Sequence, residues 1–428
     1  MKKHRFLLGL LSLCLAALLC GCGQQPVLPE TPVIPSPEPA EPEIPAPPEE
    51  PDPALPDAPE EPDPAQPDAP EEPDAPEKDP VLTRARAILA DMTAEQKLGQ
   101  VFFARRPAGD AAAFLAEYPL GGYLLFRRDL QDAQGNWLTR EAFLAQMEAD
   151  RQAAEIPMFF GTDEEGGTVC RVSQNPELFE TRFASPQKLF RQGGLDAVRQ
   201  DAAGKSAALL ALGININFAP VADVSTQKRD YMYDRAFGQD AQATADYVTA
   251  VVEEMERAGI GSVLKHFPGY GSNGDTHTAM VIDRRTREQL DECDLVPFAA
   301  GIRAGATAVL VSHNIVECMD DTLPASLSPE VHRVLREEMG FDGLILTDDL
   351  AMDAVKDYTE NGSAAVLALQ AGNDMVVTSD PAGDIAAVRQ ALEQGELTWE
   401  LVEAACLRVL QAKLRLGILP MEPQEKNA

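Results

Sequence analysis

The segment of the chain with the clearest catalytic potential is "KHFPGYGSNGDTHTAM" (265–280). Asp275 and His277 lie two residues apart in it, so the carboxylate can accept a hydrogen bond from one imidazole nitrogen and fix the tautomer of the ring. A neutral, oriented imidazole whose pKa lies near the working pH is an effective general acid or base. Metal binding and a chance surface pair are the alternatives, and for a metal ion the spacing offers no further ligand close by. We therefore predict a glycine-containing loop that transfers protons and holds no metal ion.

A second candidate is Asp348, which follows an apolar run in "GLILTDDLAMDA" (343–354). A carboxylate at the mouth of a buried strand can act as a nucleophile or as a base. Its neighbour Asp349 fits the N-cap or the first turn of the next helix. Considered alone, the Thr-Asp-Asp sequence favours capping over catalysis, and both interpretations stay open.

Two further segments carry side chains that suit a ligand rich in hydroxyl groups. In "GTDEEGGTVCRV" (161–172), Asp163 and Arg171 can hydrogen-bond vicinal hydroxyls, and the glycine pair permits close backbone approach. A tight turn with a surface ion pair is the alternative interpretation. In "DRAFG" (234–238), Arg235 points inward or is simply solvated. Neither segment decides the matter alone.

Lys265 and His266 are a more specific pair, because they end a predicted buried strand. An unpaired ammonium group is costly in such a place. A ligand with several hydroxyl groups would satisfy both side chains, so we expect both to contact substrate.

These residues are set in an alternation of short apolar runs and longer amphipathic segments. The runs are "QVFFA" (100–104), "GGYLLF" (121–126), "PMFFG" (157–161), "ININ" (214–217), "SVLK" (262–265), "AVLVS" (308–312), "GLILT" (343–347) and "DMVVT" (374–378). Alternating strands and helices predict a parallel sheet covered by helices. Eight such units favour an α/β fold with a single (β/α)8 barrel of the TIM type over a doubly wound sheet. Residues 406–419 predict a closing helix.

Polar residues follow nearly every run: Arg105, Arg106, Arg127, Arg128, Asp163, Asp223, Lys265, His266, His313, Asp348 and Asp380. The active site of a (β/α)8 barrel lies at the C-terminal ends of its strands. These side chains therefore predict one polar pocket at that end.

The first 22 residues have the layout of an export signal, with a basic start, an apolar run and small residues beside a cysteine. The ending "LCGC" resembles a bacterial lipobox, in which Cys22 is lipidated and becomes the new N-terminus. A plain signal peptide and an N-terminal anchor helix are the alternatives. We expect an exported protein that a lipid on Cys22 anchors to the cell membrane, with its folded domain outside the cytoplasm.

Residues 23–80 predict a disordered, extended linker. They contain 21 prolines and 17 acidic residues against one lysine, Lys78, and include the tandem repeats "PALPDAPEEPD" and "PAQPDAPEEPD". Such a segment buries no core and extends by self-repulsion. The chain thus divides into a signal (1–22), a linker (23–80), a catalytic domain (81–420) and a flexible tail (421–428).

Charge and cysteine usage narrow the function classes. The formal net charge of −33 argues against nucleic acid as a partner. The cysteines that follow the signal and Cys22 are Cys170, Cys293, Cys318 and Cys406. They are scattered, which predicts neither a zinc site nor a dense disulfide framework. Buried free thiols are the expectation, and a single disulfide stays open.

Taken together, the motifs resemble glycoside hydrolase family 3, in its β-N-acetylglucosaminidase branch. They occur in order as "MTAEQKLGQVF" (92–102), "GGYLLF", "DEEGGTVCRV", "NFAPVADV" (217–224), "DRAFG", "KHFPGYGSNGDTH", "LPASLSPE" (323–330) and "GFDGLILTDDLAM" (340–352). The resemblance implies a (β/α)8 barrel, a retaining two-step mechanism and a His–Asp dyad as acid/base. It also implies a carbohydrate substrate, a GlcNAc-containing muropeptide or glycan, with no cofactor and a monomeric enzyme.

The resemblance also implies a role for each matching residue. Asp348 corresponds to the nucleophile, His277 to the acid/base and Asp275 to its orienting partner. The sugar-binding positions correspond to Asp163, Arg171, Arg235, Lys265 and His266. Thr168 and Tyr270 stand where many relatives have arginine and histidine, which leaves the aglycone preference open. A β-glycosidase or phosphorylase of other specificity, or a non-catalytic sugar-binding surface lipoprotein, are the alternatives.

Overall fold

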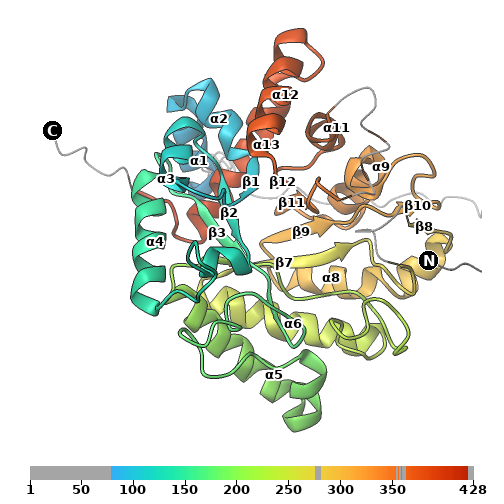
Figure 1. Ribbon diagram of the computed structural model, residues 1–428. Coiled ribbons are helices and arrows are strands. Elements are labelled where there is room, and N and C mark those ends of the chain that lie inside the picture. Colours follow the sequence, from blue (N-terminus) through green and yellow to red (C-terminus); the bar gives the residue numbers. More distant parts are fainter. Residues whose placement is uncertain (1–78, 275–280, 353–354, 356–357, 359–362, 423–428) are drawn as a thin grey trace, which may run out of the picture. The chain divides into compact units, whose positions relative to one another are not determined.

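The computed structural model describes residues 79–422 except 275–280, 353–354, 356–357 and 359–362 (Figure 1). Its centre is an eight-stranded parallel sheet in the order β11-β9-β7-β6-β3-β2-β1-β12. The strands are β1 (Phe102–Arg105), β2 (Gly122–Leu125), β3 (Phe159–Thr162), β6 (Ile216–Asn217), β7 (Gly261–Phe267), β9 (Ala308–Val311), β11 (Leu344–Thr347) and β12 (Val376–Thr378). Each of the eight predicted runs contributes one of these strands, and no boundary is shifted by more than two residues.

The sheet curls into a nearly closed barrel. At its two ends, Leu346 of β11 and Met375, beside β12, form an isolated parallel bridge. The amide of Thr347 donates to the Met375 carbonyl at 3.2 Å. The predicted (β/α)8 barrel is therefore confirmed. Counted around the ring, β1 lies opposite β7, and β3 lies opposite β11.

Alternate side chains of the strands point into the barrel and outward to the helices, as the two-residue period of a strand requires. Val263 of β7 belongs to the interior cluster, whereas the next residue, Leu264, packs with the helices. The ring of Phe103 fills the interior, edge to face with Phe218 at 5.2 Å. A Cβ at Gly161 would lie 2.8 Å from the Phe103 ring, so only glycine fits there.

Helices cover the outside of the barrel (Figure 1). They are α1 (Pro80–Asp91), α2 (Ala94–Gln100), α3 (Ala111–Glu117), α4 (Arg140–Ala153), α5 (Pro186–Leu210), α6 (Ala241–Ala258), α7 (Arg287–Glu292), α8 (Leu295–Arg303), α9 (Pro329–Arg333), α11 (Ala364–Ala371), α12 (Pro381–Gln394) and α13 (Trp399–Arg415). Helix α6 shows why such a helix forms. The Asp240 side chain caps its start, and Gly259 at φ 75° ends it. Val248 and Val252 on one face of the helix are buried.

The predicted closing helix at 406–419 is observed as α13, which starts earlier, at Trp399. Val409 and Ala412 of α13 belong to the interior cluster. A Cβ on Gly261, the first residue of β7, would lie 3.1 Å from Leu416. The helix therefore closes the end of the barrel at which the strands begin, and the opposite end stays available for a site.

Two short strand pairs lie outside the barrel. The hairpin of β4 (Glu164–Gly166) and β5 (Val169–Cys170) directly follows β3, and β8 (Ile282–Asp283) pairs with β10 (Ile315–Val316). Cys170, Cys293, Cys318 and Cys406 are free thiols, and Cys318 is exposed. A bilayer-spanning helix is not found among the described residues, where every helix is too short or too polar for that.

Candidate active site

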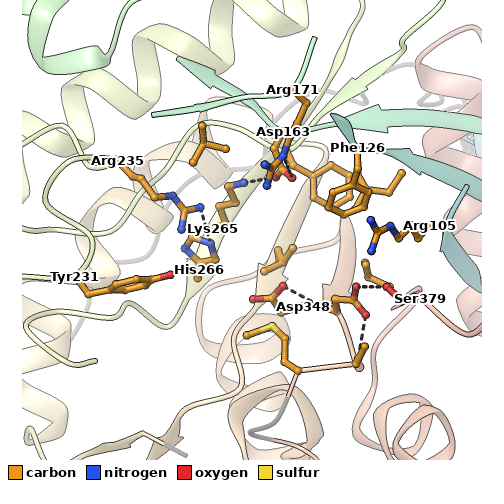
Figure 2. Close-up of a pocket in the computed structure, with 18 residues that line it drawn as sticks. Arg105, Phe126, Asp163, Arg171, Tyr231, Arg235, Lys265, His266, Asp348 and Ser379 are labelled. Atoms are coloured by element: carbon orange, nitrogen blue, oxygen red, sulfur yellow. Dashed lines mark hydrogen bonds and ion pairs between the residues drawn. The ribbon is translucent and has the colours of Figure 1, made fainter. Parts of the chain in front are cut away.

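A cavity of about 530 Å³ lies at the C-terminal end of the barrel strands (Figure 2). Six of the predicted site residues line it: Asp163, Arg171, Arg235, Lys265, His266 and Asp348. Asp275 and His277 lie outside the described residues, as does Cys22. The strand order accounts for this assembly. Asp163 follows β3 and Asp348 follows β11, which face each other across the ring, and Lys265 and His266 belong to β7 between them.

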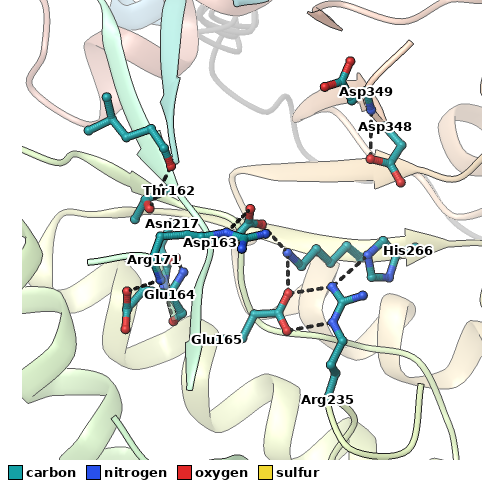
Figure 3. A network of polar contacts seen from close by, with 12 residues as sticks. Thr162, Asp163, Glu164, Glu165, Arg171, Asn217, Arg235, His266, Asp348 and Asp349 are labelled. Carbon is teal, nitrogen blue, oxygen red and sulfur yellow. Dashed lines mark hydrogen bonds and ion pairs between the residues drawn. The ribbon is translucent and has the colours of Figure 1, made fainter. Parts of the chain in front are cut away.

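Lys265 is the centre of a buried ionic network. Figure 3 labels the network members Asp163, Glu165 and Arg235. Nζ of Lys265 lies 2.7 Å from Asp163 Oδ1 and 2.7 Å from Glu165 Oε1. The protein itself therefore supplies two carboxylates to this ammonium group, which lines the cavity where a ligand would also reach it. Burial alone would raise the pKa of Asp163, but the charges of Lys265 and Arg171 outweigh it and hold the pKa below its usual value. The carboxylate is thus ionised and ready to accept from a hydroxyl group.

Arg235 points inward and is held by Glu165. Its Nε donates to Oε2 at 3.0 Å and its Nη2 to Oε1 at 2.7 Å, a bidentate pair that fixes the guanidinium plane. Burial opposes the charge of Glu165, yet Lys265 and Arg235 together lower its pKa. Of the two interpretations of the Arg-Ala-Phe-Gly segment, solvation of the arginine is therefore excluded.

The tautomer of His266 follows from its neighbours. Nη2 of Arg235, which can only donate, lies 3.3 Å from Nε2, so Nε2 accepts. Nδ1 carries the proton and donates to Asp223 Oδ2 at 2.7 Å. Asp223 also accepts from the backbone amide of Tyr270 at 2.8 Å, and the buried Tyr270 ring packs edge to face against the imidazole at 5.2 Å. Both Lys265 and His266 reach the cavity because the register of β7 shifts between Leu264 and Phe267.

Arg171 is positioned by the loop that follows β5. Buried Glu164 accepts from the backbone amides of Arg171 at 3.0 Å and Val172 at 2.7 Å, which fixes this loop. The guanidinium lies over the Phe126 ring at 5.6 Å, and its Nε is 3.6 Å from Asp163 Oδ2. This contact is longer than a hydrogen bond. The arginine and the aspartate therefore flank one space in the cavity without neutralising each other completely.

Asp348 and Asp349 have different environments. Oδ1 of Asp348 accepts from the backbone amide of Asp349 at 2.8 Å. Asp349 instead accepts from Ser379 Oγ at 2.6 Å and from the amide of Ala351 at 3.0 Å. Buried His313 donates from Nε2 to the Asp349 carbonyl at 3.0 Å. The predicted capping role thus fits the local turn at Asp349, while Asp348 presents its carboxylate to the cavity.

Sequence reasoning missed Glu165 as a site residue and did not single out Phe126 or Tyr231, which line the cavity. The signal for Glu165 was its spacing of two from Asp163 in an extended segment, which places both side chains on one side.

Several post-strand residues do not line the cavity, contrary to the prediction. Arg106 pairs with Asp150, Arg127 and Arg128 are exposed, Asp223 and His313 lie behind it, and Asp380 caps α12.

Comparison with known proteins identifies the family. The profile described as glycosyl hydrolase family 3 N-terminal domain matches residues 93–412. A β-hexosaminidase of Xylella fastidiosa is 33% identical over 272 residues, which cover 63% of this chain and 78% of that protein.

Solved structures give the same family. A glycoside hydrolase family 3 β-N-acetylglucosaminidase from Paenibacillus sp. superposes with a TM-score of 0.70 at 29% identity, and the match covers 78% of this chain but only 65% of that one. A β-N-acetylhexosaminidase from Beutenbergia cavernae superposes with a TM-score of 0.67 at 29% identity, covering 76% of this chain and 99% of that one. The family profile matches three quarters of the chain, and the barrel carries a polar cavity at its mouth. The chain therefore belongs to glycosyl hydrolase family 3.

Proposed function

We propose that this protein is a retaining, exo-acting β-N-acetylglucosaminidase that removes terminal β-linked GlcNAc from peptidoglycan fragments or related glycans. The observation that carries the proposal is the position of Asp348. Its carboxylate lines the cavity from the β11 side, opposite Asp163 on the β3 side. A sugar ring held between these walls would present its anomeric carbon to a carboxylate. The names of the β-hexosaminidase and β-N-acetylglucosaminidase relatives support the choice of sugar.

The charged residues that line the cavity support binding of a sugar with vicinal hydroxyl groups. Ionised Asp163 accepts from a hydroxyl, whereas Arg235, Lys265 and Arg171 donate. The ion pairs of Lys265 with Asp163 and of Arg235 with Glu165 fix these side chains before substrate arrives, so little conformational entropy is lost on binding. In this proposal, these residues and His266 orient the terminal sugar.

Asp348 is the proposed nucleophile. In the first step one of its oxygens bonds to the anomeric carbon while the bond from that carbon to the aglycone oxygen breaks. The departing oxygen takes a proton from His277, which Asp275 orients. In the second step water attacks the anomeric carbon, returns a proton to His277 and releases Asp348, so the configuration is retained. The amide of Asp349 that holds Oδ1 of Asp348 supports a fixed orientation of the attacking group.

We also propose that the protein is exported and anchored through a lipid on Cys22, with residues 23–80 as the spacer and 81–420 as the catalytic domain. The support is the basic–apolar–cysteine start and the acidic, proline-rich composition that follows it. A spacer of this kind would hold the active site away from the membrane surface.

A chromogenic assay tests the proposed activity. Aryl β-glycosides of GlcNAc, glucose and other sugars are incubated with the full chain, with and without inorganic phosphate. Selective turnover of the GlcNAc glycoside, unchanged by phosphate, is the expected result. Formation of a sugar phosphate would reassign the protein as a phosphorylase, preference for another sugar would change its specificity, and no turnover would indicate a sugar-binding protein.

A further inference from the structure

Arg105, the last residue of β1, is a cavity residue that the proposed chemistry does not use. Because β1 lies opposite β7 in the ring, Arg105 faces the wall that carries Lys265 and His266. Figure 2 shows its guanidinium beside Phe126, at the side of the cavity away from Arg235 and Tyr231. The guanidinium carbon stacks on the Phe126 ring at 4.5 Å, which leaves the edge of the plane with its N–H donors directed elsewhere.

One donor of Arg105 lacks a partner. Its Nε is buried and has no hydrogen-bond acceptor among the described residues. The same is true of Nε of Arg171, which lies over the same phenyl ring. Buried unsatisfied donors cost free energy. The planar, forked donors of a guanidinium group suit the oxygens of an oxyanion. Two such donors around one ring mark a place where a ligand can supply acceptors.

The local charges also favour an anion. Among the described residues, the only carboxylate that forms an ion pair with either guanidinium is Asp163, whose Oδ2 lies 3.6 Å from Arg171 Nε and whose Oδ1 already pairs with Lys265. Burial and the charge of Arg128 lower the pKa of Arg105, while Asp129 and Asp349 act in the opposite direction. Asp349 is engaged by Ser379. Positive charge is therefore incompletely compensated at this wall.

We infer that Arg105, stacked on Phe126 and backed by Arg171, forms a subsite for an anionic group of the saccharide, a carboxylate or a phosphate. This inference rests on the proposed function, because it adds a specificity determinant to the same cavity. The anion can come from the aglycone or from a substituent on the terminal sugar, and the two sources are separated by experiment.

The test uses two matched pairs of GlcNAc β-glycosides. In one pair the aglycone ring carries a carboxylate or its primary amide, and in the other C6 of the sugar carries a phosphate or a hydroxyl. The quantity measured is the ratio of kcat/KM within each pair, for the native chain and for Arg105→Gln. Because both enzymes cleave the same leaving groups, a change in this ratio reports recognition of the anion.

For one of the pairs, Arg105→Gln is expected to lower kcat/KM about tenfold more for the anionic member than for the neutral one, as the loss of a charge-assisted hydrogen bond implies. Arg105→Lys keeps the charge but not the fork and should lose less. The control Arg127→Gln removes one positive charge from an exposed side chain stacked on Trp137, outside the cavity lining, and should leave both ratios within twofold of the native values.

Equal losses for both members of both pairs, or the same change of ratio in Arg127→Gln, would overturn the subsite. If the native chain hydrolyses none of the four glycosides, the proposed function fails instead. The subsite is then tested by calorimetric titration of the same ligands, where a preference for an anionic member that is lost in Arg105→Gln supports it and no such preference refutes it.

Discussion

At the scale of single residues, neighbouring aspartates acquire different roles from their surroundings. Among the described residues, the Asp348 carboxylate accepts only from the amide of Asp349, whereas the Asp349 carboxylate accepts from Ser379 and from its own turn. Asp348→Ala should therefore lower turnover of aryl GlcNAc glycosides on the order of 10⁴-fold or more, for good and poor leaving groups alike, because no glycosyl-enzyme can form. Steady-state kinetics measure this loss, with Asp349→Asn as the control that should lose far less.

A fluorinated slow substrate should label the native enzyme on the peptide containing "LTDDLAM" (346–352), at Asp348. Labelling at Asp349 would shift the role of nucleophile to that residue and keep the mechanism. An inverted anomer in early NMR spectra of the product would contradict the retaining mechanism altogether.

His277 belongs to the same scale. His277→Ala should reduce kcat/KM about 10²–10⁴-fold for glycosides with poor leaving groups, which depend most on protonation, and much less for activated aryl groups. A leaving-group series measures this dependence. Asp275→Asn should give a milder loss of the same kind, since it removes the orienting charge but keeps the shape. A uniform loss across the series would mean that His277 has a structural role.

At the scale of elements, α13 and the start of the barrel meet at a buried lysine. Lys413 is completely buried, donates to Gln100 Oε1 at 2.5 Å and lies over the Phe159 ring. Burial lowers the pKa of Lys413 to about 7. Between pH 7 and the ordinary lysine pKa near 10.5, the unfolded chain binds more protons than the folded one. The free energy of unfolding therefore rises with pH in this window.

This pH dependence is a testable property of α13. Each pKa unit corresponds to about 1.4 kcal/mol, so the free energy of unfolding of the native chain should increase by a few kcal/mol between pH 7 and pH 10 relative to Lys413→Met. Urea unfolding at several pH values measures the difference. The control Lys97→Met removes a lysine of α2 that pairs with Glu403 of α13. The stability curve of this variant against pH should run parallel to the native one. Parallel curves for Lys413→Met would show that Lys413 stays charged.

At the scale of the whole molecule, the proposed anchor residue precedes in the sequence the barrel that carries the site. Cys22→Ala should move the protein from the membrane fraction to the soluble fraction, with unchanged activity per molecule, because lipid attachment requires the thiol. Fractionation with activity assays measures both. Cys20→Ala, two residues away, should leave the protein in the membrane. A membrane-bound Cys22→Ala protein would mean that another segment holds the chain there.

The sequence alone determined the fold class, because period and composition are local properties. Each apolar run of four to six residues became a barrel strand, and the C-terminal ends of parallel strands must lie at one end of a barrel. Asp163, Lys265 and Asp348 could therefore be assigned to one site although they are far apart in the chain. The short motifs around them were sufficient to indicate the family.

What only the tertiary structure decided are the partners of these residues, because a partner depends on register and rotamer across the barrel. Nothing local indicates that Glu165 binds both Lys265 and Arg235, the latter 70 residues away, or that Asp223 fixes the tautomer of His266. The same holds for Arg105, the last residue of β1, and for Arg106 directly after it. The first reaches the cavity and the second pairs with Asp150, because consecutive side chains of a strand point to opposite faces.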